Sequence, residues 1–426
     1  MGRRRLFIVS VIGFTAASAL CGVATSLGGI VVARLLQGVF GASLVPMSQA
    51  VLLDINPREK VGQAMAIWGA GIMVGPILGP MLGGWLTDSL GWRWVFFINL
   101  PIGAIALLGI VRFLPDTPPR RERLDVFGFV SLSIAIGMLQ LFLDRGQQLD
   151  WFDSWEIKLE AAAALVAFAY FAVHTWTVEG VSFVNRELLK DGNFVAGALF
   201  GFVVGMILFG TMALLPTFLQ TLMDYPVVYT GMVTAPRGIG TMAAMLVVSR
   251  LVQRVDPRAI MAVGFSLIAF ALWQMTRYTL DMDSTLIVVS GVIQGVGVGL
   301  TFVPLSTAAF ATLAPRLRNQ GTPIYSLLRN IGNSVGISVA QVLLTDRAVA
   351  AHAALAASVA PGNHALSALP PQLNLADPVG LALVNVEATR QAALIGYLGD
   401  FAIMMTVTLA AIPLLLLMRS PKRARE

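Results

Sequence analysis

The sequence is poor in the residue types on which most soluble proteins rely. Only 12% of its residues are charged, against about a quarter in typical soluble domains, and 57% are hydrophobic, with a mean hydropathy of +0.78. A single cysteine, Cys21, excludes a disulfide framework and a cysteine-ligated metal cluster. The three histidines, His174, His352 and His364, lack metal-ligand spacing. We therefore expect no metal or other cofactor, and lipid as the solvent of most of the chain.

Catalytic signatures are missing as well. The chain has no phosphate-binding Walker loop, and no grouping of serine, histidine and carboxylate, or of paired carboxylates, suggests hydrolysis. Gly295, Gly297 and Gly299 have the spacing of a dinucleotide loop, but they lie inside an apolar segment with no preceding strand. We predict that the chain is not an enzyme. The pI near 9.8 does not indicate nucleic-acid binding, because the basic residues lie between apolar segments.

Twelve apolar segments carry about the 20 residues that a helix needs to cross the hydrocarbon core of a bilayer. The segment after Met1 has full spanning length and no small-residue cleavage site, which favours a retained helix over a signal peptide. The sequence therefore predicts an all-α polytopic membrane protein. The twelve predicted spans are 6–27, 30–53, 62–86, 93–114, 126–143, 157–177, 193–222, 229–250, 258–277, 285–313, 321–345 and 395–418.

The distribution of basic residues predicts the orientation of these spans. If the N-terminus faces the cytoplasm, 20 of the 29 lysines and arginines fall in inner segments, six in outer segments and three inside spans. Cytoplasmic segments of membrane proteins carry the excess of positive charge. We therefore expect both termini to be cytoplasmic.

The second and third spans recur as the tenth and eleventh. The stretch from Val31 aligns with the stretch from Val288, so that Gln37 falls on Gln294. A parallel repeat in a polytopic protein is typical of a secondary transporter made of two pseudo-symmetric helix bundles, with the substrate path between them.

The polar, proline-rich run 115–125 marks a bundle boundary, after which two spans and then six follow. The repeated pair is fourth and fifth in that last group but second and third at the front. Symmetry therefore predicts two further spans ahead of Met1, giving 12 spans of a parent of 14; a natural twelve-span chain with uneven halves is the alternative. The predicted domains are a partial N-terminal bundle at 1–114, a linker with two central helices at 115–180, and a six-helix bundle at 181–426 with a long outer loop at 346–394.

Four stretches together resemble one family. Residues 34–38, RLLQG, resemble the fourth-helix motif of major facilitator antiporters, and the glycine-rich run 71–84 resembles their fifth-helix antiporter motif. The run 92–103, WRWVFFINLPIG, is similar to the sixth-helix entry of the fourteen-helix drug:proton antiporters of the EmrB/QacA type, and 328–332, LRNIG, resembles their thirteenth helix. The resemblance covers the whole chain. It implies the major facilitator fold, with helices three to fourteen of the family present.

The resemblance also implies a function. We expect a proton-coupled multidrug efflux permease of the bacterial inner membrane, which exports small amphiphilic compounds in exchange for protons by alternating access. A periplasmic adaptor protein is the partner that the family implies, and the outer loop is a candidate docking element. Two alternatives stay open: a non-transporting remnant or sensor, since the acidic residue of the family's first helix is absent, and an exporter of one specific lipid, siderophore or antibiotic.

Charged and polar groups within the spans are the candidate transport residues. Arg34 lies inside a span, where a charge costs about 3 kcal/mol, so it is expected to face a polar cavity. Arg237 and Arg329 are the other two buried cations. The resemblance implies proton handling for Arg34, beside the candidate cavity residue Gln37; a structural salt bridge is the alternative. Arg237, expected in an irregular helix, and Arg329 could attract anionic substrates or balance Asp400. Asp400 itself is either a proton-exchanging acid or a solvated acid at the membrane rim.

A row of glycines in the third span predicts a smooth helix face. Residues four apart lie on one side of a helix, where glycines allow another backbone to approach closely. We expect this face to act as a hinge and seal between the bundles, with simple tight packing as the alternative. The row and its two prolines are Gly71, Gly75, Pro76, Gly79, Pro80 and Gly83.

Overall fold

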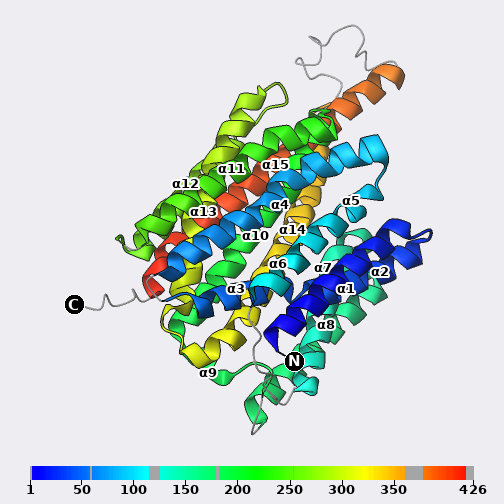
Figure 1. The fold of residues 1–426 in the computed structure, drawn as a ribbon. Helices are drawn as coiled ribbons and strands as arrows, with labels where there is room; N and C mark the ends of the chain where they lie inside the picture. The colour runs from blue at the N-terminus through cyan, green and yellow to red at the C-terminus, as the bar shows by residue number, and fades with distance from the viewer. Residues whose placement is uncertain are drawn as a thin grey trace.

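The computed structural model describes residues 2–57, 60–114, 125–178, 182–252, 254–359 and 378–418, and helix is the regular structure found in this part of the chain. Figure 1 shows long helices that run roughly along one direction. Before the linker lie α1 (Arg3–Val23), α2 (Leu27–Gly41), α3 (Leu44–Ile55), α4 (Val61–Leu90), α5 (Trp94–Phe97) and α6 (Asn99–Phe113). The central elements are α7 (Val126–Arg145), the 3-10 turns η2 (Gln147–Leu149) and η3 (Trp151–Asp153), and α8 (Trp155–Thr177).

The C-terminal part contains the longest helices. They are α9 (Arg186–Lys190), α10 (Gly192–Leu222), α11 (Val227–Leu251), α12 (Pro257–Met275), α13 (Ser284–Ala311), η4 (Pro315–Leu317), α14 (Arg318–Ser358), α15 (Pro378–Leu414) and η7 (Leu415–Leu417).

Each of the twelve predicted spans lies on one helix or on two consecutive helices. Among the described residues, 11 helical segments are long and apolar enough to cross a membrane. The helix α4 is not among these 11 segments. It is 30 residues long and coincides with the predicted span 62–86, but some of its side chains are not described. The all-α polytopic fold is therefore confirmed.

The segment 346–394, expected as an outer loop, is helical at both ends. The helix α14 continues to Ser358 and α15 begins at Pro378. The run AVAAHAALAAS is rich in alanine, the residue with the highest helix propensity, and a proline fits the first helical position because its missing N–H is not needed there. A hydrogen bond of 3.0 Å between His352 and Asn385 joins the two helical extensions.

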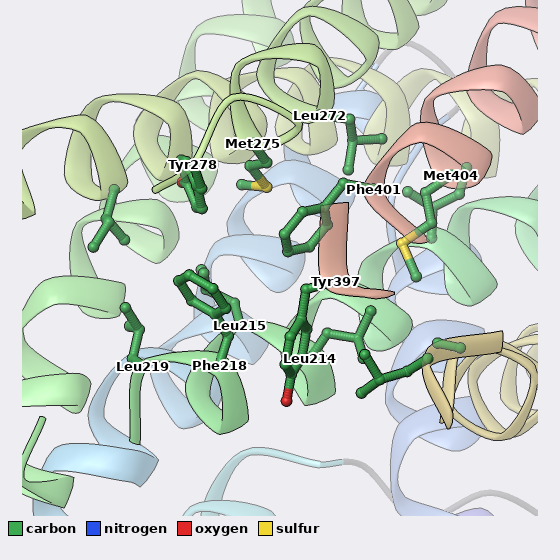
Figure 2. Packing of buried hydrophobic residues seen from close by; sticks show 14 of the residues in the cluster. Leu214, Leu215, Phe218, Leu219, Leu272, Met275, Tyr278, Tyr397, Phe401 and Met404 are labelled. Atoms are coloured by element: carbon green, nitrogen blue, oxygen red, sulfur yellow. The ribbon is translucent and has the colours of Figure 1, made fainter. Parts of the chain in front are cut away.

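The C-terminal bundle is held together by an aromatic cluster. Phe218 of α10 packs edge-on against Tyr397 of α15, with ring centroids 5.3 Å apart, and lies 6.0 Å from Tyr278. Figure 2 shows these rings together with Phe401 and the leucines of α10 in one core. Burial raises the pKa of Tyr278, which follows the end of α12, to about 12, so this phenol is neutral at physiological pH.

The helix α4 lies where the two halves of the molecule meet. It follows α3 in the chain but packs on α11 and α13 of the C-terminal bundle, as its position in Figure 1 also shows. Its residues Met65 and Ala66 are fully buried, and Ala66 shares a core with Met245 and Phe302. The two halves therefore contact each other through this helix.

The central hairpin α7–α8 is bonded to the C-terminal bundle. At one end, Ser338 of α14 donates a 3.0 Å hydrogen bond to Asp144. At the other end, Asp125 accepts hydrogen bonds of 2.9 Å from the backbone N–H of Phe183, which leads into α9, and from that of Gly128. Burial alone would raise the pKa of Asp125, but these hydrogen bonds, with one from His174, outweigh burial and hold its pKa below the ordinary value.

Candidate functional site

A cavity of about 220 Å³ lies between α4 and the C-terminal bundle. Helix α4 contributes Ile72, and α10, α11, α13 and α14 supply the rest of the wall. The wall is mostly apolar, with a small number of polar groups, as is usual for binding sites of small molecules. Its residues include Leu208, Phe209, Met212, Leu215, Thr234, Arg237, Thr241, Phe302, Arg329, Asn330 and Asn333.

Arg237 reaches this cavity from α11. The helix is continuous from Val227 to Leu251 through Pro236, so the expectation of an irregular helix was wrong. Arg237 is buried, with 8% of its surface exposed, and its guanidinium donates to the Leu208 backbone oxygen at 3.3 Å.

A glycine of α13 permits the close approach of α11 at this point. A Cβ atom at Gly295 would lie only 1.9 Å from the Arg237 backbone oxygen and 3.0 Å from Thr241 Oγ1. One turn earlier, at Gly291, a Cβ would meet Arg237 Cβ at an ordinary 3.6 Å. Gly295 therefore sets how near Arg237 lies to α13.

Arg329 enters the same cavity from α14. Its guanidinium carbon lies 5.5 Å from the centre of the Phe302 ring, a distance at which a cation is attracted to the aromatic face. Phe302 also stacks with Trp68 of α4, with ring centroids 6.4 Å apart. The structure thus brings together two of the sequence-predicted cations, Arg237 and Arg329.

Asp400 lies apart from that cavity. It is 1% exposed, and in the described part of the chain neither of its carboxylate oxygens has a hydrogen-bond partner. It lines a separate apolar space of about 40 Å³ with residues such as Ile207, Ala340 and Met404. The alternative of a solvated acid is not found, because Asp400 is buried where α15 packs on α14 and α10.

A polar pair, Thr211 and Gln294, lies beside this space, and Thr211 was not among the predicted candidates. Thr211 accepts a 3.3 Å hydrogen bond from Gln294, and its hydroxyl is 3.6 Å from the Met404 sulfur. Both polar residues are fully buried. Threonine is common in membrane helices, so the sequence held no signal that would have singled out Thr211.

Arg34 and Gln37 form a third site, on α2. Arg34 donates a 3.1 Å hydrogen bond to Gln37 and lies 5.2 Å from the centre of the Phe96 ring. Gln37 is buried, whereas Arg34 is exposed and pairs with no carboxylate among the described residues. The alternative of a structural salt bridge is therefore not found, and these two residues are not part of the cavity wall around Arg237.

The glycine row of α4 faces open space. A Cβ at Gly71, Gly75, Gly79 or Gly83 would meet no other described atom within 4 Å. The helix packs on its neighbours through other glycines: a Cβ at Gly69 would lie 3.0 Å from Met245. Among the described residues neither tight packing nor another helix backbone is found on this row, because the contacts with α11 lie on another side of α4, and the role of the row as a hinge and seal stays a prediction.

Long apolar helices with an internal repeat, enclosing a cavity where two halves meet, define a polytopic membrane transporter. Residues 1–337 match the family model of the Major Facilitator Superfamily. The chain is 34% identical to the fatty acid resistance protein FarB of Neisseria gonorrhoeae, over 99% of this chain and 84% of that protein. It is also 34% identical to the multidrug export protein EmrB of Escherichia coli, over 91% of this chain and 75% of EmrB. The chain therefore belongs to the Major Facilitator Superfamily, in the branch that contains EmrB, and is a multi-pass protein of the inner membrane.

Solved structures agree with this fold. The human organic anion transporter MFSD10 (TETRAN) superposes with a TM-score of 0.57 at 16% identity, covering 96% of this chain and 77% of that one. A bacterial homologue of the human lysosomal transporter Spinster, inward-facing and unoccupied, gives 0.54 at 18% identity, covering 99% and 85%. At these identities the likeness concerns the fold alone.

Proposed function

We propose that this chain is a proton-coupled efflux permease that exports small amphiphilic compounds by alternating access. The observation that carries the proposal is the mostly apolar cavity between α4 and the C-terminal bundle, with its few polar groups. The names of two relatives, a multidrug export protein and a fatty acid resistance protein, support a role in export of such compounds.

The test is transport by purified protein in liposomes with an imposed pH gradient. The substitution Leu208→Trp places a large ring in the cavity and is expected to abolish gradient-driven accumulation of an amphiphilic dye. The matched control, Leu199→Trp, adds the same ring to the exposed surface of the same helix and should transport normally. Equal transport by both variants would contradict export through this cavity.

Asp400 is the acid that we assign to proton coupling in this part of the transporter. A proton removes the charge that its apolar surroundings disfavour, so its protonation can be linked to the conformation of α15. The side chain of Arg347 lies across the neighbouring Gly399, which places a cation next to the acid. Release of the proton would leave a carboxylate that Arg347 can attract.

The variant Asp400→Asn separates coupling from transport. It should exchange dye across liposome membranes without a gradient and fail to accumulate dye when a pH gradient is applied. The control Asp144→Asn removes an acid that accepts hydrogen bonds from Gln140 and Ser338, and it should keep its coupling. Gradient-driven accumulation by Asp400→Asn at the wild-type level would refute the assignment.

Arg34 and Gln37 are proposed as a second proton-handling group. Their hydrogen bond and the exposure of Arg34 leave its guanidinium available to an acid from another helix. An arginine keeps its charge, so its role is to orient or stabilise that acid. Arg34→Gln should weaken gradient-driven accumulation of the dye more than its exchange without a gradient. The control is Arg93→Gln, which removes a cation that stacks on Trp92 and should affect neither process. Equal accumulation by both variants would argue against this role.

Orientation and partner complete the proposal. The excess of basic residues on one side supports cytoplasmic termini. Fused to the C-terminus, a reporter that works only in the cytoplasm should be active, and a reporter that works only in the periplasm should be inactive. The helical extensions of α14 and α15 project on the opposite side and offer a surface to a periplasmic adaptor. Tagged protein should capture such an adaptor from native membranes, and a variant lacking residues 349–386 should not.

A further inference from the structure

The cavity contains two positive charges and, among its described lining residues, no acidic side chain. The hydrogen bond that the structure gives the Arg237 guanidinium goes to a neutral backbone oxygen of Leu208. Arg329 faces the ring of Phe302 and has no carboxylate partner in the described residues. The nearby phenol of Tyr278 is neutral, and Asp400 lines a different space.

Two unpaired cations at this depth are unfavourable in the empty cavity. A charge inside a membrane span is costly unless it is paired or solvated, and like charges in an apolar wall also repel each other. A bound cation would add a third positive charge to this group. An anion is the ligand whose binding neutralises these charges, and guanidinium groups bind carboxylate and phosphate oxygens through paired, charge-assisted hydrogen bonds.

The rest of the cavity limits what can be attached to that anion. Its volume of about 220 Å³ is below the range of about 300 to 1,000 Å³ that is usual for sites of drug-sized ligands. Most of the remaining wall is formed by apolar side chains such as Ile72, Leu208 and Met212. One acyl chain or a small ring system fits these limits better than a bulky multi-ring compound.

We infer that this cavity selects amphiphiles with an anionic head group, with Arg237 and Arg329 as the residues that bind the head group. The inference rests on the proposed export function only for the step from binding to transport. The ring face of Phe302 lies against the Arg329 guanidinium, and the Leu208 backbone oxygen accepts a hydrogen bond from the Arg237 guanidinium, so both groups are positioned before the ligand arrives. Such preorganisation reduces the entropy lost on binding.

The experiment compares four ligands that share one ten-carbon tail. Binding of decanoate, decyl phosphate, decyltrimethylammonium and 1-decanol is measured by calorimetry at pH 8, with wild-type protein in nanodiscs of zwitterionic lipid. We expect both anions to bind about tenfold or more tightly than the cation. Equal or tighter binding of decyltrimethylammonium would overturn the inference.

Variants locate the selectivity. Arg329→Gln should weaken anion binding about tenfold and leave 1-decanol binding unchanged, and Arg329→Lys, which keeps the charge, should weaken it less. Arg237→Gln should act like Arg329→Gln. The matched control is Arg277→Gln, because Arg277 stacks on Trp273, away from the cavity. An equal loss of anion binding in Arg277→Gln and Arg329→Gln would mean that anions are attracted by the protein's overall charge, and would refute the site.

Failure of this inference and failure of the proposed function give different results. Binding is measured without a proton gradient, so anion selectivity with no gradient-driven transport would refute the export function and retain the site. Gradient-driven transport of compounds such as 1-decanol, with no preference for anions in binding, would retain the export function and refute the anion site. If Arg237→Gln does not fold, the Arg329→Gln and Arg329→Lys pair still decides the question.

Discussion

Replacing Gly295 by alanine tests whether α11 and α13 are in backbone contact beside Arg237. The added Cβ would lie 1.9 Å from the Arg237 backbone oxygen and 2.9 Å from its carbonyl carbon. Since both are main-chain atoms, the two helices must separate by about 1 Å or more to restore ordinary contact. The alanine at Gly291, one turn away on the same helix, meets only the Arg237 Cβ at 3.6 Å.

The expected difference in stability follows from these distances. Overpacking of this kind costs about 1 to 3 kcal/mol, whereas alanine in place of glycine inside a helix contributes up to about 1 kcal/mol of stability. We expect Gly295→Ala to be destabilised by about 1 to 2 kcal/mol net and Gly291→Ala to be neutral or slightly stabilised. The assay is thermal unfolding of purified protein in detergent, followed by tryptophan fluorescence.

The same pair also affects ligand binding. A separation of α11 from α13 moves Arg237 within the cavity wall, so Gly295→Ala should bind decanoate more weakly, while Gly291→Ala should match the wild type. If Gly295→Ala melts at the same temperature as Gly291→Ala and binds equally well, the close approach described here is wrong.

Three further changes have distinct expected outcomes. Asp125→Asn should lower the free energy of unfolding by about 1.5 to 3 kcal/mol at neutral pH. Because folding lowers the pKa of Asp125, this difference between wild type and variant should persist down to about pH 4 and vanish as the pH falls further through the lowered pKa. Urea unfolding at several pH values measures the free energy of unfolding. Gly75→Ala should leave thermal stability unchanged because its face is open, and a loss of transport would then show that this face closes during the cycle. Ser338→Ala removes a hydrogen bond to Asp144 and should cost about 1 kcal/mol, seen as greater mobility of a spin label on α8.

The spans could be predicted from the sequence because each depends on a local property. About 20 consecutive apolar residues must form a helix in lipid, since no water is present to satisfy the backbone. The extent of the helical ends of 346–394 was not predicted, because the spans were predicted from membrane crossing, and a helix that continues beyond the bilayer needs only local propensity.

The arrangement of the candidate site depended on contacts that the sequence does not contain. Arg237 and Arg329 were recognised as costly charges, but their meeting in one cavity depends on the rotation of α11 and α14 about their axes. Those rotations are set by close packing at positions such as Gly295, far away in the chain. For the same reason the burial of Asp400 could not be distinguished from exposure at the rim until α15 was seen against α10 and α14.

The attachment of the α7–α8 hairpin changes the shape of the body that would rotate during alternating access. Asp144 accepts a hydrogen bond from Ser338 of α14 near one end of the hairpin, and Asp125 accepts one from the Phe183 backbone ahead of α9 at the other, so a tilt of the hairpin away from the C-terminal bundle would break both bonds. If the two halves rotate against each other during transport, the hairpin would then move with the C-terminal bundle, and the moving body would contain eight long helices in place of six.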